Sequence, residues 1–586
     1  MEINVHLDAN TIVLHRSMLE DNDKASIETR LHMKKIINKF YADYEENKYC
    51  DEEAIDILNE KLNYLEGEIK TICNKYGRLE FTLLYRRVPT SMFFDRFESS
   101  STAINVQRIC MLFILKYCKN LSDNIIWSEI NGSYISWLNY DYNMFVDLSI
   151  FIMLCETYNL TLNHRRIIWK DGCIILLEDD IKIEMSKKLE EVINFYDKRL
   201  SFNNASIYSR TGLGSVIDLG IKPKLLYGIP YCYNKLEEKD SIVYHIKDNI
   251  YNLPKPNFYF DYSDAKEFIK ILEIYKIDYE ETHNNTIEEL VTFIIIISNK
   301  ITFDLITNPK YTIYQVTQRG LLFYILDDLK RDLGLVFKDC YKKIFSMEYK
   351  GDVSNIINHF FDTFLVTYDY EKYEIDMFSP YSAFYEYEKS IGIDLTYFII
   401  MISEILRQIN ISSKTKEIKG LKYENNLYNF ISNRLPSLEK LFKPNKKITL
   451  DEKDITDIDL SYIINDVGFI IECKGYAQTI KCILGEKKEV DYRWTDFDEF
   501  YIKLDDVCKI LSDNPKGDNY EIPKKVKKII PIICSSAVEF LFEIKSYLNP
   551  DIPNICTPLE LLWLIIHFDT ENIHSKTVYY NVNHNK

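Results

Sequence analysis

The stretch DIDLSYIINDVGFIIECKGY, Asp457–Tyr476, predicts a β-hairpin whose second strand ends in charged residues. Two apolar runs flank Asn465-Asp466, and both residue types tolerate the positive φ angle that a two-residue hairpin turn requires. The second run ends in Glu472-Cys473-Lys474, although long apolar strands normally exclude Glu and Lys unless these are paired or hold a ligand. The charged end of the hairpin is therefore a candidate functional site.

With this turn, Asp459 faces Glu472, and Asp457 faces Lys474, across the two strands. Because side chains alternate along a strand, these four residues lie on one face of the predicted hairpin. The opposite face collects apolar pairs, namely Ile458 with Cys473, Leu460 with Ile471, and Tyr462 with Phe469. Directly opposed carboxylates repel each other, and a divalent cation between them would remove that repulsion.

The residue types at this end suit one kind of chemistry. Carboxylate oxygens are the hard ligands that Mg²⁺ prefers, and one or two carboxylates with waters and a substrate phosphate are its usual shell. Lys474, two residues after Glu472, points the same way and can orient a metal-activated water for attack on phosphorus. The pattern therefore predicts metal-dependent hydrolysis of a phosphodiester, with Asp459 and Glu472 as the metal ligands.

The sequence around the hairpin predicts a defined order of helices and strands. The expected elements are a helix at 422–435, a strand at 446–450, the two hairpin strands, a helix at 500–511 and a strand at 527–536. The polar segment 410–420 is the expected boundary of this part. An α/β domain with an αβββαβ core is thus expected at 415–586.

Asp459 and Glu472-Cys473-Lys474, in this order of elements, resemble the PD-(D/E)xK nuclease superfamily, which has the restriction-endonuclease-like fold. The resemblance covers residues 419–566, although Ile458 stands where the name-giving motif has Pro. It implies that Asp459 and Glu472 bind Mg²⁺ or Mn²⁺ and that Lys474 assists the attacking water. The family's glutamate from the first core helix would correspond to Glu424, a further catalytic candidate, and its helical Gln to Gln478.

Three alternatives stay open at this point. The charged residues could form surface ion pairs on an edge hairpin, although the run GFII is typical of a central strand. The domain could be a non-catalytic scaffold or adaptor that keeps the nuclease fold. The nuclease could also be directed to RNA rather than to DNA, which is the expected substrate.

The first 410 residues predict a mostly helical region, which could contain two subdomains. A small hairpin is expected near 165–178, with Asp171-Gly172 as its turn. A helical body joined to such a nuclease is similar to effectors of prokaryotic defence against phage and plasmids. By that analogy, the N-terminal region would regulate cleavage or bind a regulatory protein, and cutting of both strands would call for a homodimer.

Charge and cysteine content narrow the functional classes. The net charge of −17 argues mildly against a bulk nucleic-acid binder. From Thr415 onward, however, 24 Lys and Arg stand against 27 Asp and Glu, compared with 48 against 62 before it. The 13 cysteines include no CxxC pair, so a zinc module is not expected. With no secretory signal and no recognised membrane span, the sequence predicts a cytoplasmic protein with reduced cysteines and no membrane contact.

Overall fold

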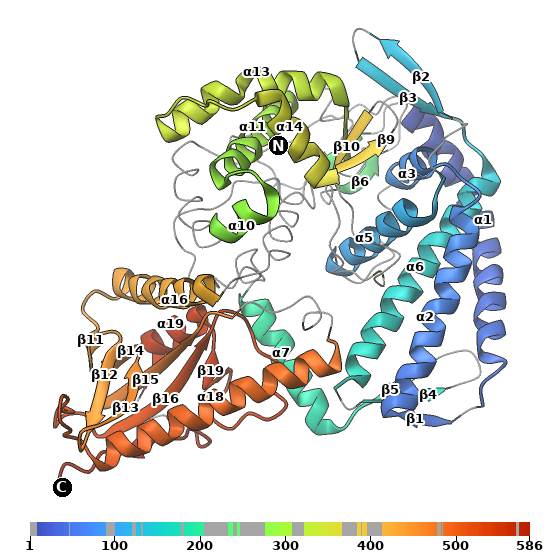
Figure 1. The fold of residues 1–586 in the computed structure, drawn as a ribbon. Coiled ribbons are helices and arrows are strands. Elements are labelled where there is room, and N and C mark those ends of the chain that lie inside the picture. Colours follow the sequence, from blue (N-terminus) through green and yellow to red (C-terminus); the bar gives the residue numbers. More distant parts are fainter. Residues whose placement is uncertain are drawn as a thin grey trace. The chain divides into compact units, whose positions relative to one another are not determined.

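The structure is a computed structural model that describes residues 9–45, 47–88, 100–119, 125–130, 133–170, 172–176, 181–203, 233–237, 243–246, 276–307, 321–365, 375, 384–387, 390–394, 413–476, 482, 485–569 and 573–585. The chain divides into two compact units. The N-terminal unit comprises Met1–Glu184, Pro223–Ile269 and Asn285–Ile402, and the C-terminal unit comprises Met185–Lys222, Lys270–Asn284 and Ser403–Lys586. The described chain has an α+β fold with several small sheets (Figure 1).

Long helices form the first part of the N-terminal unit. They are α1 (Ala9–Tyr41), α2 (Asp51–Cys73), α3 (Arg78–Arg86), α5 (Ser100–Tyr117) and α6 (Tyr142–Ile168), and a hairpin of β2 (Ile125–Ile130) and β3 (Ser133–Leu138) lies between α5 and α6 in the chain. Both α1 and α2 pack against α6. The buried residues of α2 recur every three to four positions, because one face of the helix contacts its neighbours.

Helix α6 is long and apolar enough to cross a membrane by length and composition. However, 61% of its most apolar 18-residue window is buried inside the protein. The core helix of a folded domain gives the same signal, because such a helix buries most of its circumference against other helices. Sequence inspection missed this span, since its apolar residues are interrupted by single polar ones such as Asp147 and Glu156.

The hairpin predicted near 165–178 is wrong in its position. Arg165 and Ile168 belong to the last turn of α6, and the hairpin is formed instead by β4 (Cys173–Leu176) and β5 (Ile181–Glu184). Strand β1 (Lys48–Cys50) pairs with β4 and completes a three-stranded antiparallel sheet. The consecutive apolar residues of RRIIW are therefore explained by the end of a buried helix, which a short window does not distinguish from a strand.

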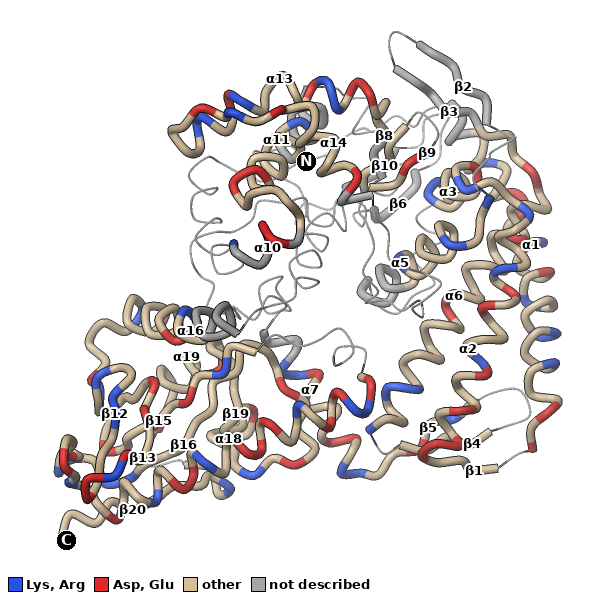
Figure 2. The backbone as a smooth tube through the Cα atoms, in the orientation of Figure 1, with Lys and Arg blue, Asp and Glu red and all other residues tan. Residues whose placement is uncertain are grey.

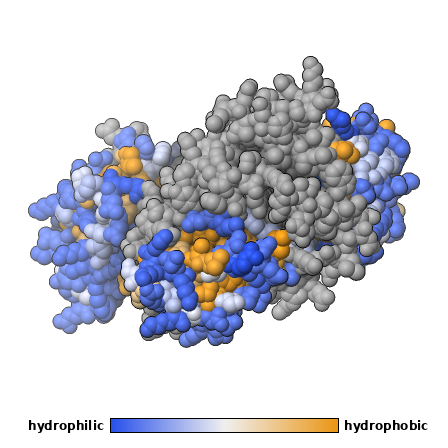
Figure 3. All heavy atoms as spheres, turned by 90° about the horizontal axis from the view of Figure 1, so that it is seen from above, coloured by the Kyte–Doolittle hydropathy of each residue, from blue (hydrophilic) through white to orange (hydrophobic). Residues whose placement is uncertain are grey.

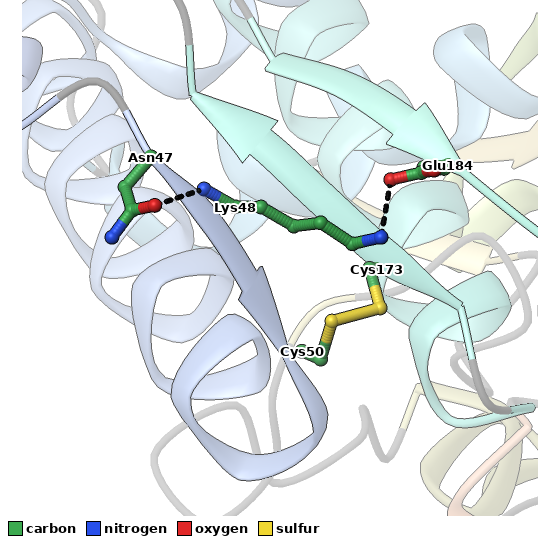
Figure 4. The surroundings of a disulfide bond; sticks show 5 residues. All are labelled: Asn47, Lys48, Cys50, Cys173 and Glu184. Atoms are coloured by element: carbon green, nitrogen blue, oxygen red, sulfur yellow. Dashed lines mark hydrogen bonds and ion pairs between the residues drawn. A yellow bond between two sulfur atoms is a disulfide. The ribbon is translucent and has the colours of Figure 1, made fainter.

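The cysteines are not all reduced, contrary to the prediction from sequence. Cys50 and Cys173, which are opposite each other in β1 and β4, form a disulfide (Figure 4). On the same sheet, the Lys48 Nζ lies 2.6 Å from a Glu184 carboxylate oxygen. The disulfide joins residues 123 positions apart, so it ties the start of α2 to the strand that follows α6.

The second part of the N-terminal unit combines helices with another small sheet. The helices are α11 (Ile287–Thr307), α13 (Leu326–Phe345) and α14 (Val353–Leu365); the sheet contains β8 (Leu321–Ile325), β10 (Ser390–Asp394) and β9 (Phe384–Tyr387), and β6 (Tyr233–Glu237) pairs with β7 (Val243–Ile246). On the face of the molecule in Figure 3, hydrophilic residues border a hydrophobic area on the described surface.

The C-terminal unit is built around a mixed sheet. Its main strands are β11 (Glu439–Lys440), β14 (Leu460–Ile464), β15 (Val467–Lys474), β16 (Lys528–Ser535) and β19 (Ile555–Cys556), in that spatial order, with β20 (Tyr580–Asn581) also paired to β16. β14 is antiparallel to β15, whereas β15 and β16 are parallel. A separate ribbon is formed by β12 (Lys446–Leu450) and β13 (Lys453–Ile458), and β17 (Tyr547–Asn549) pairs with β18 (Ile552–Pro553).

Helices cover both faces of this sheet. One core contains residues of α16 (Ser413–Arg434) and α19 (Pro558–His567) together with Phe469, Ile471 and Cys473 of β15. The other core contains residues of α18 (Lys487–Asp513) together with Ile470 of β15. The alternation of β15 side chains between these cores explains why its apolar run is continuous: a strand between two helical layers needs apolar residues on both faces.

The register of the central hairpin is as predicted. Leu460 pairs with Ile471 and Ile464 with Val467, and Asn465 has the positive φ of 57° that the turn requires. Because β15 lies between β14 and β16, the alternative of an edge hairpin is excluded. The ladder, however, stops at Leu460, because the chain bends at Asp459, between β13 and β14.

Helix α7 (Lys187–Asn203), which the sequence prediction assigned to the N-terminal region, belongs to the C-terminal unit, as does α10 (Lys276–His283). The Arg199 guanidinium donates to both carboxylate oxygens of Glu560, at 2.8 and 2.9 Å, and both side chains are buried. It also donates to the backbone carbonyls of Ile555 and Glu539. This buried cation anchors α7 beside β19 and α19.

Candidate active site

Asp459 lies at the bend between β13 and β14, beside the carboxyl end of β15. Its Oδ2 accepts a hydrogen bond of 2.7 Å from the backbone N–H of Cys473. Its own backbone carbonyl accepts one from the N–H of Asn445. The Asp459 carboxylate thus satisfies a strand N–H where the β14–β15 ladder has ended, which fixes the side chain against β15.

Glu472 and Lys474 occupy the last positions of β15 that face the α18 side of the sheet. The Lys474 Nζ donates to Glu472 Oε1 at 2.5 Å, and both side chains are mostly buried. The ammonium also lies 4.4 Å from the ring centroid of Phe500, a residue of α18. Lys474 is therefore held by an ion pair and by a cation–π contact.

Glu424 reaches the same place from α16. The helix passes close to the residue after β15: a Cβ added at Gly475 would lie only 2.9 Å from the Cβ of Tyr423, so only glycine fits there. Glu424, the next residue of α16, hydrogen-bonds the side chain of Asn445. It also lies close enough to interact electrostatically with Glu472 and Lys474. The structure thus brings together the four residues that were predicted to be catalytic or metal-binding: Glu424, Asp459, Glu472 and Lys474.

The carboxyl groups are difficult to ionise together in the absence of a metal. Burial, followed by repulsion from Glu472, raises the pKa of Asp459 to about 7, against the opposing hydrogen bond from Cys473 N–H. Burial and the same repulsion also raise the pKa of Glu424, although Lys474 and Asn445 act in the other direction. Acids with raised pKa values that face one another are typical of sites where a cation or proton is handled.

Lys474 is stabilised in its charged form. Burial on its own would lower the pKa of Lys474, but attraction to Glu472 and the hydrogen bond between them outweigh it and raise the pKa. The side chain is therefore an ammonium at neutral pH and can act as a hydrogen-bond donor or as a positive charge. It has no free pair of electrons with which to accept a proton.

Two details of the predicted site are wrong. Asp457 does not face Lys474, because β13 turns away from β15 and pairs with β12, where Asp457 is opposite Lys447. For the same reason, Ile458 packs in the core on the α18 side, whereas Cys473 packs in the other core. Cys473 is buried, which raises its pKa, as expected for an unreactive core thiol. Gln478 lies outside the described residues.

The donor set offers two carboxylates for a metal. Among the described residues, no group of three or more His, Cys, Asp or Glu side chains is arranged to hold a metal ion by itself. Mg²⁺ commonly takes only one or two protein carboxylates and completes its shell with waters and phosphate oxygens. Asp459 and Glu472 fit that requirement chemically, and a cation between them would relieve the repulsion that raises the pKa of Asp459.

Sequence reasoning missed several residues around the site. Asn445 connects Asp459 with Glu424, and its positive φ of 53° belongs to the turn after Pro444. Phe500 comes from the helix after the hairpin, and only its contact with Lys474 reveals its place. The Pro-Asn dipeptide is a turn signal that could have indicated Asn445, whereas no local pattern indicates Phe500.

Among the described residues around the site, basic residues do not predominate. Acidic and basic residues are interspersed along α18 and the neighbouring strands (Figure 2). In α18 itself, acids outnumber bases. Binding of a polyanion by bulk electrostatic attraction is therefore not favoured here, and local contacts would have to contribute.

Comparison of the chain with protein-family models, with curated proteins and with solved structures gives no match.

Proposed function

We propose that the C-terminal unit is a metal-dependent nuclease related to the restriction-endonuclease-like enzymes, with DNA as the favoured substrate. The observation that supports it best is the convergence of Asp459, Glu472 and Lys474 at the carboxyl end of a central strand, with Glu424 beside them. The sheet of β14, β15 and β16 with helices on both faces is compatible with such a fold, although β12, which was expected as the first core strand, pairs with β13 in a separate ribbon. These carboxylates and this lysine are the residue types that metal-assisted phosphodiester hydrolysis uses.

In this proposal each residue has a separate role. Asp459 and Glu472 hold the cation, and the hydrogen bond from Cys473 N–H keeps Asp459 in position. When bound, Mg²⁺ or Mn²⁺ lowers the pKa of a coordinated water and polarises the phosphate. Lys474 is an ammonium, so it orients the attacking water by donating to it and stabilises the negative charge on the phosphate oxygens in the transition state. Glu424 supports this arrangement through Asn445.

A second candidate is a non-catalytic scaffold that binds a partner through the same unit. The contact between Lys474 and Glu472 favours it, because the ammonium occupies one of the oxygens that a metal would take. In the nuclease, binding of the cation would displace Lys474 from this oxygen. In the scaffold, the ion pair would persist whatever metal is added. RNA in place of DNA remains a variant of the nuclease proposal.

The N-terminal unit would then regulate cleavage, bind a controlling protein or mediate dimerisation, as in a defence effector directed at phage or plasmids. That part of the proposal rests on the fold-level analogy alone.

The test compares wild type with Lys474→Ala on plasmid DNA, single-stranded DNA and RNA, each with Mg²⁺, Mn²⁺ or EDTA. Lys447→Ala is the matched control, because Lys447 is an exposed lysine on β12 that pairs with Asp454. We expect metal-dependent cleavage that Lys474→Ala reduces by at least about 100-fold, a typical effect of losing one positioned group of this kind, and that Lys447→Ala leaves unchanged. Calorimetric titration with Mg²⁺ distinguishes the alternatives if nothing is cut: binding that Asp459→Asn abolishes supports the metal site, whereas no binding to wild type supports the scaffold.

A further inference from the structure

Tyr476, two residues beyond Lys474, presents a half-exposed aromatic ring next to the candidate active site. Its relative exposure is 52%, although it comes only two residues after the end of a buried central strand. One side of the ring stacks on Phe500, with centroids 6.0 Å apart and planes 22° from parallel. Phe500 is the residue that contacts the Lys474 ammonium, so the exposed ring and the lysine share one aromatic neighbour.

The backbone of Tyr476 is fixed more firmly than its exposure suggests. Its carbonyl oxygen accepts hydrogen bonds from Arg493 Nη2 at 3.0 Å and from Ser536 Oγ at 2.8 Å. Ser536 N–H also donates to the carbonyl of Lys474, which continues the attachment of this segment to the end of β16. The exposed ring is therefore carried by a backbone that is anchored from two elements.

A buried ion pair in turn anchors Arg493. Its guanidinium donates to both carboxylate oxygens of Glu539, at 2.5 and 2.6 Å, and Ser535 Oγ donates to the same carboxylate. Glu539 is almost fully buried, so this cluster is rigid and has no solvent-facing role of its own. Its structural consequence is to hold the Tyr476 carbonyl, and with it the ring, in one place.

We propose that Tyr476 is a substrate-binding residue that stacks on an unpaired base next to the scissile phosphate, so that the nuclease acts on single-stranded or locally opened nucleic acid. This inference rests on the proposed nuclease function and names its substrate class. A fixed ring with an open surface is what base stacking requires, and bases inside an intact duplex do not offer their faces to it. The mixed charge around α18 agrees with a site that gains affinity from stacking as well as from phosphate contacts.

The experiment measures binding of the full-length protein to oligonucleotides that contain one 2-aminopurine, whose fluorescence is quenched when it stacks. The three probes are single-stranded DNA, single-stranded RNA and a DNA duplex with the 2-aminopurine paired, each in EDTA and with Ca²⁺. The variants are Tyr476→Ala, Tyr476→Phe and, as a control, Tyr492→Ala, because Tyr492 is a more exposed tyrosine at 68% on α18. Cleavage of unlabelled single strands by the same variants is measured with Mg²⁺.

We expect wild type to quench the single-stranded probes more than the duplex. Loss of one base–aromatic stack should weaken single-strand binding by about 5- to 150-fold in Tyr476→Ala. Tyr476→Phe keeps the aromatic ring and should weaken binding much less than Tyr476→Ala, and Tyr492→Ala should bind as wild type. An equal effect of Tyr476→Ala on the single-stranded DNA and RNA probes would show that the stack does not distinguish deoxyribose from ribose. An effect on one of the two probes would identify the substrate. Wild-type binding and cleavage that Tyr476→Ala leaves unchanged, or a clear preference for the duplex, would overturn this inference and leave the proposed nuclease standing. Absence of both binding and cleavage in wild type would overturn the nuclease proposal itself.

Discussion

The substitution Arg199→Met tests how firmly α7 is held in the C-terminal unit. Methionine keeps an unbranched side chain that can lie in the same space but removes the guanidinium. Glu560 would then be a buried carboxylate whose described ion-pair partner is gone, while it still accepts from Thr557 N–H within its own helix. The carbonyls of Ile555 and Glu539 would lose a donor as well.

The expected cost follows from this burial. Arg199 is 3% exposed and Glu560 1% exposed at the side chain, so solvent cannot replace the lost partner. Removing one member of such a pair typically costs about 3–5 kcal/mol. The neighbouring pair, Lys198 with Asp551, is the matched comparison, because these side chains are 64% and 59% exposed and such pairs contribute only about 0–1 kcal/mol.

Hydrogen exchange followed by mass spectrometry measures this difference locally, which avoids assuming that a two-unit chain unfolds in one step. In Arg199→Met, peptides from α7 and α19 should exchange faster by about two to four orders of magnitude. In Lys198→Ala the same peptides should exchange at most about fivefold faster. Peptides from α2 and α6, in the other unit, serve as the internal reference.

Equal exchange in the two variants would refute the reasoning, since it would mean that the buried pair holds α7 no better than the exposed one. The double variant Arg199→Met/Glu560→Leu provides a second check. If the cost of the single substitution comes from an isolated buried charge, removing both charges should restore much of the protection. Greater loss in the double variant would show instead that the hydrogen bonds to the carbonyls and the helix cap dominate.

The remaining predictions concern pH and the disulfide. The pKa of Asp459 is raised to about 7, so without metal the native state binds more protons than the unfolded state between about pH 4 and pH 7, and its stability should fall as pH rises through that window. In EDTA, Tm should therefore fall more steeply with pH for wild type than for Asp459→Asn, and parallel curves would contradict the raised pKa. Cys50 and Cys173 close a loop of more than 100 residues, so Cys173→Ser should destabilise the N-terminal unit by about 2–5 kcal/mol in thermal unfolding under non-reducing conditions. Intact mass after alkylation without reductant should show this pair protected, and full alkylation would contradict the disulfide.

Local patterns were sufficient for the central hairpin of the C-terminal unit. The turn at Asn465-Asp466 and the alternation of apolar residues allow only one register that keeps both cores apolar, and the structure has that register. The same local patterns predicted that the pairing with β15 continues past Asp459, but the chain bends there and the ladder ends. That bend allows β13 to pair with β12, a competition between two partners that the residues of β13 alone do not decide.

The N-terminal unit shows the same limit. Periodicity indicated its helices, but RRIIW was assigned to a strand, because a short apolar run such as Ile167–Trp169 fits a strand or the end of a buried helix equally well. The pairing of Cys50 with Cys173 could not be predicted from cysteine spacing, since it depends on β1 and β4 meeting across 123 residues. Composition alone therefore gave an incorrect expectation of reduced cysteines throughout.

By itself, the sequence determined the strand that carries Glu472 and Lys474, the turn that precedes it and the side of the strand on which both residues lie. These features depend on neighbours within about 20 residues, where the chain has little freedom to choose another arrangement. Only the tertiary structure decided that Asn445 joins Asp459 to Glu424. It also decided that Phe500 contacts both Lys474 and Tyr476. The same holds for Arg199, which is buried against Glu560, 361 positions away. Such contacts form between segments that meet only when the whole unit packs, because their energies depend on burial and partner geometry rather than on local sequence.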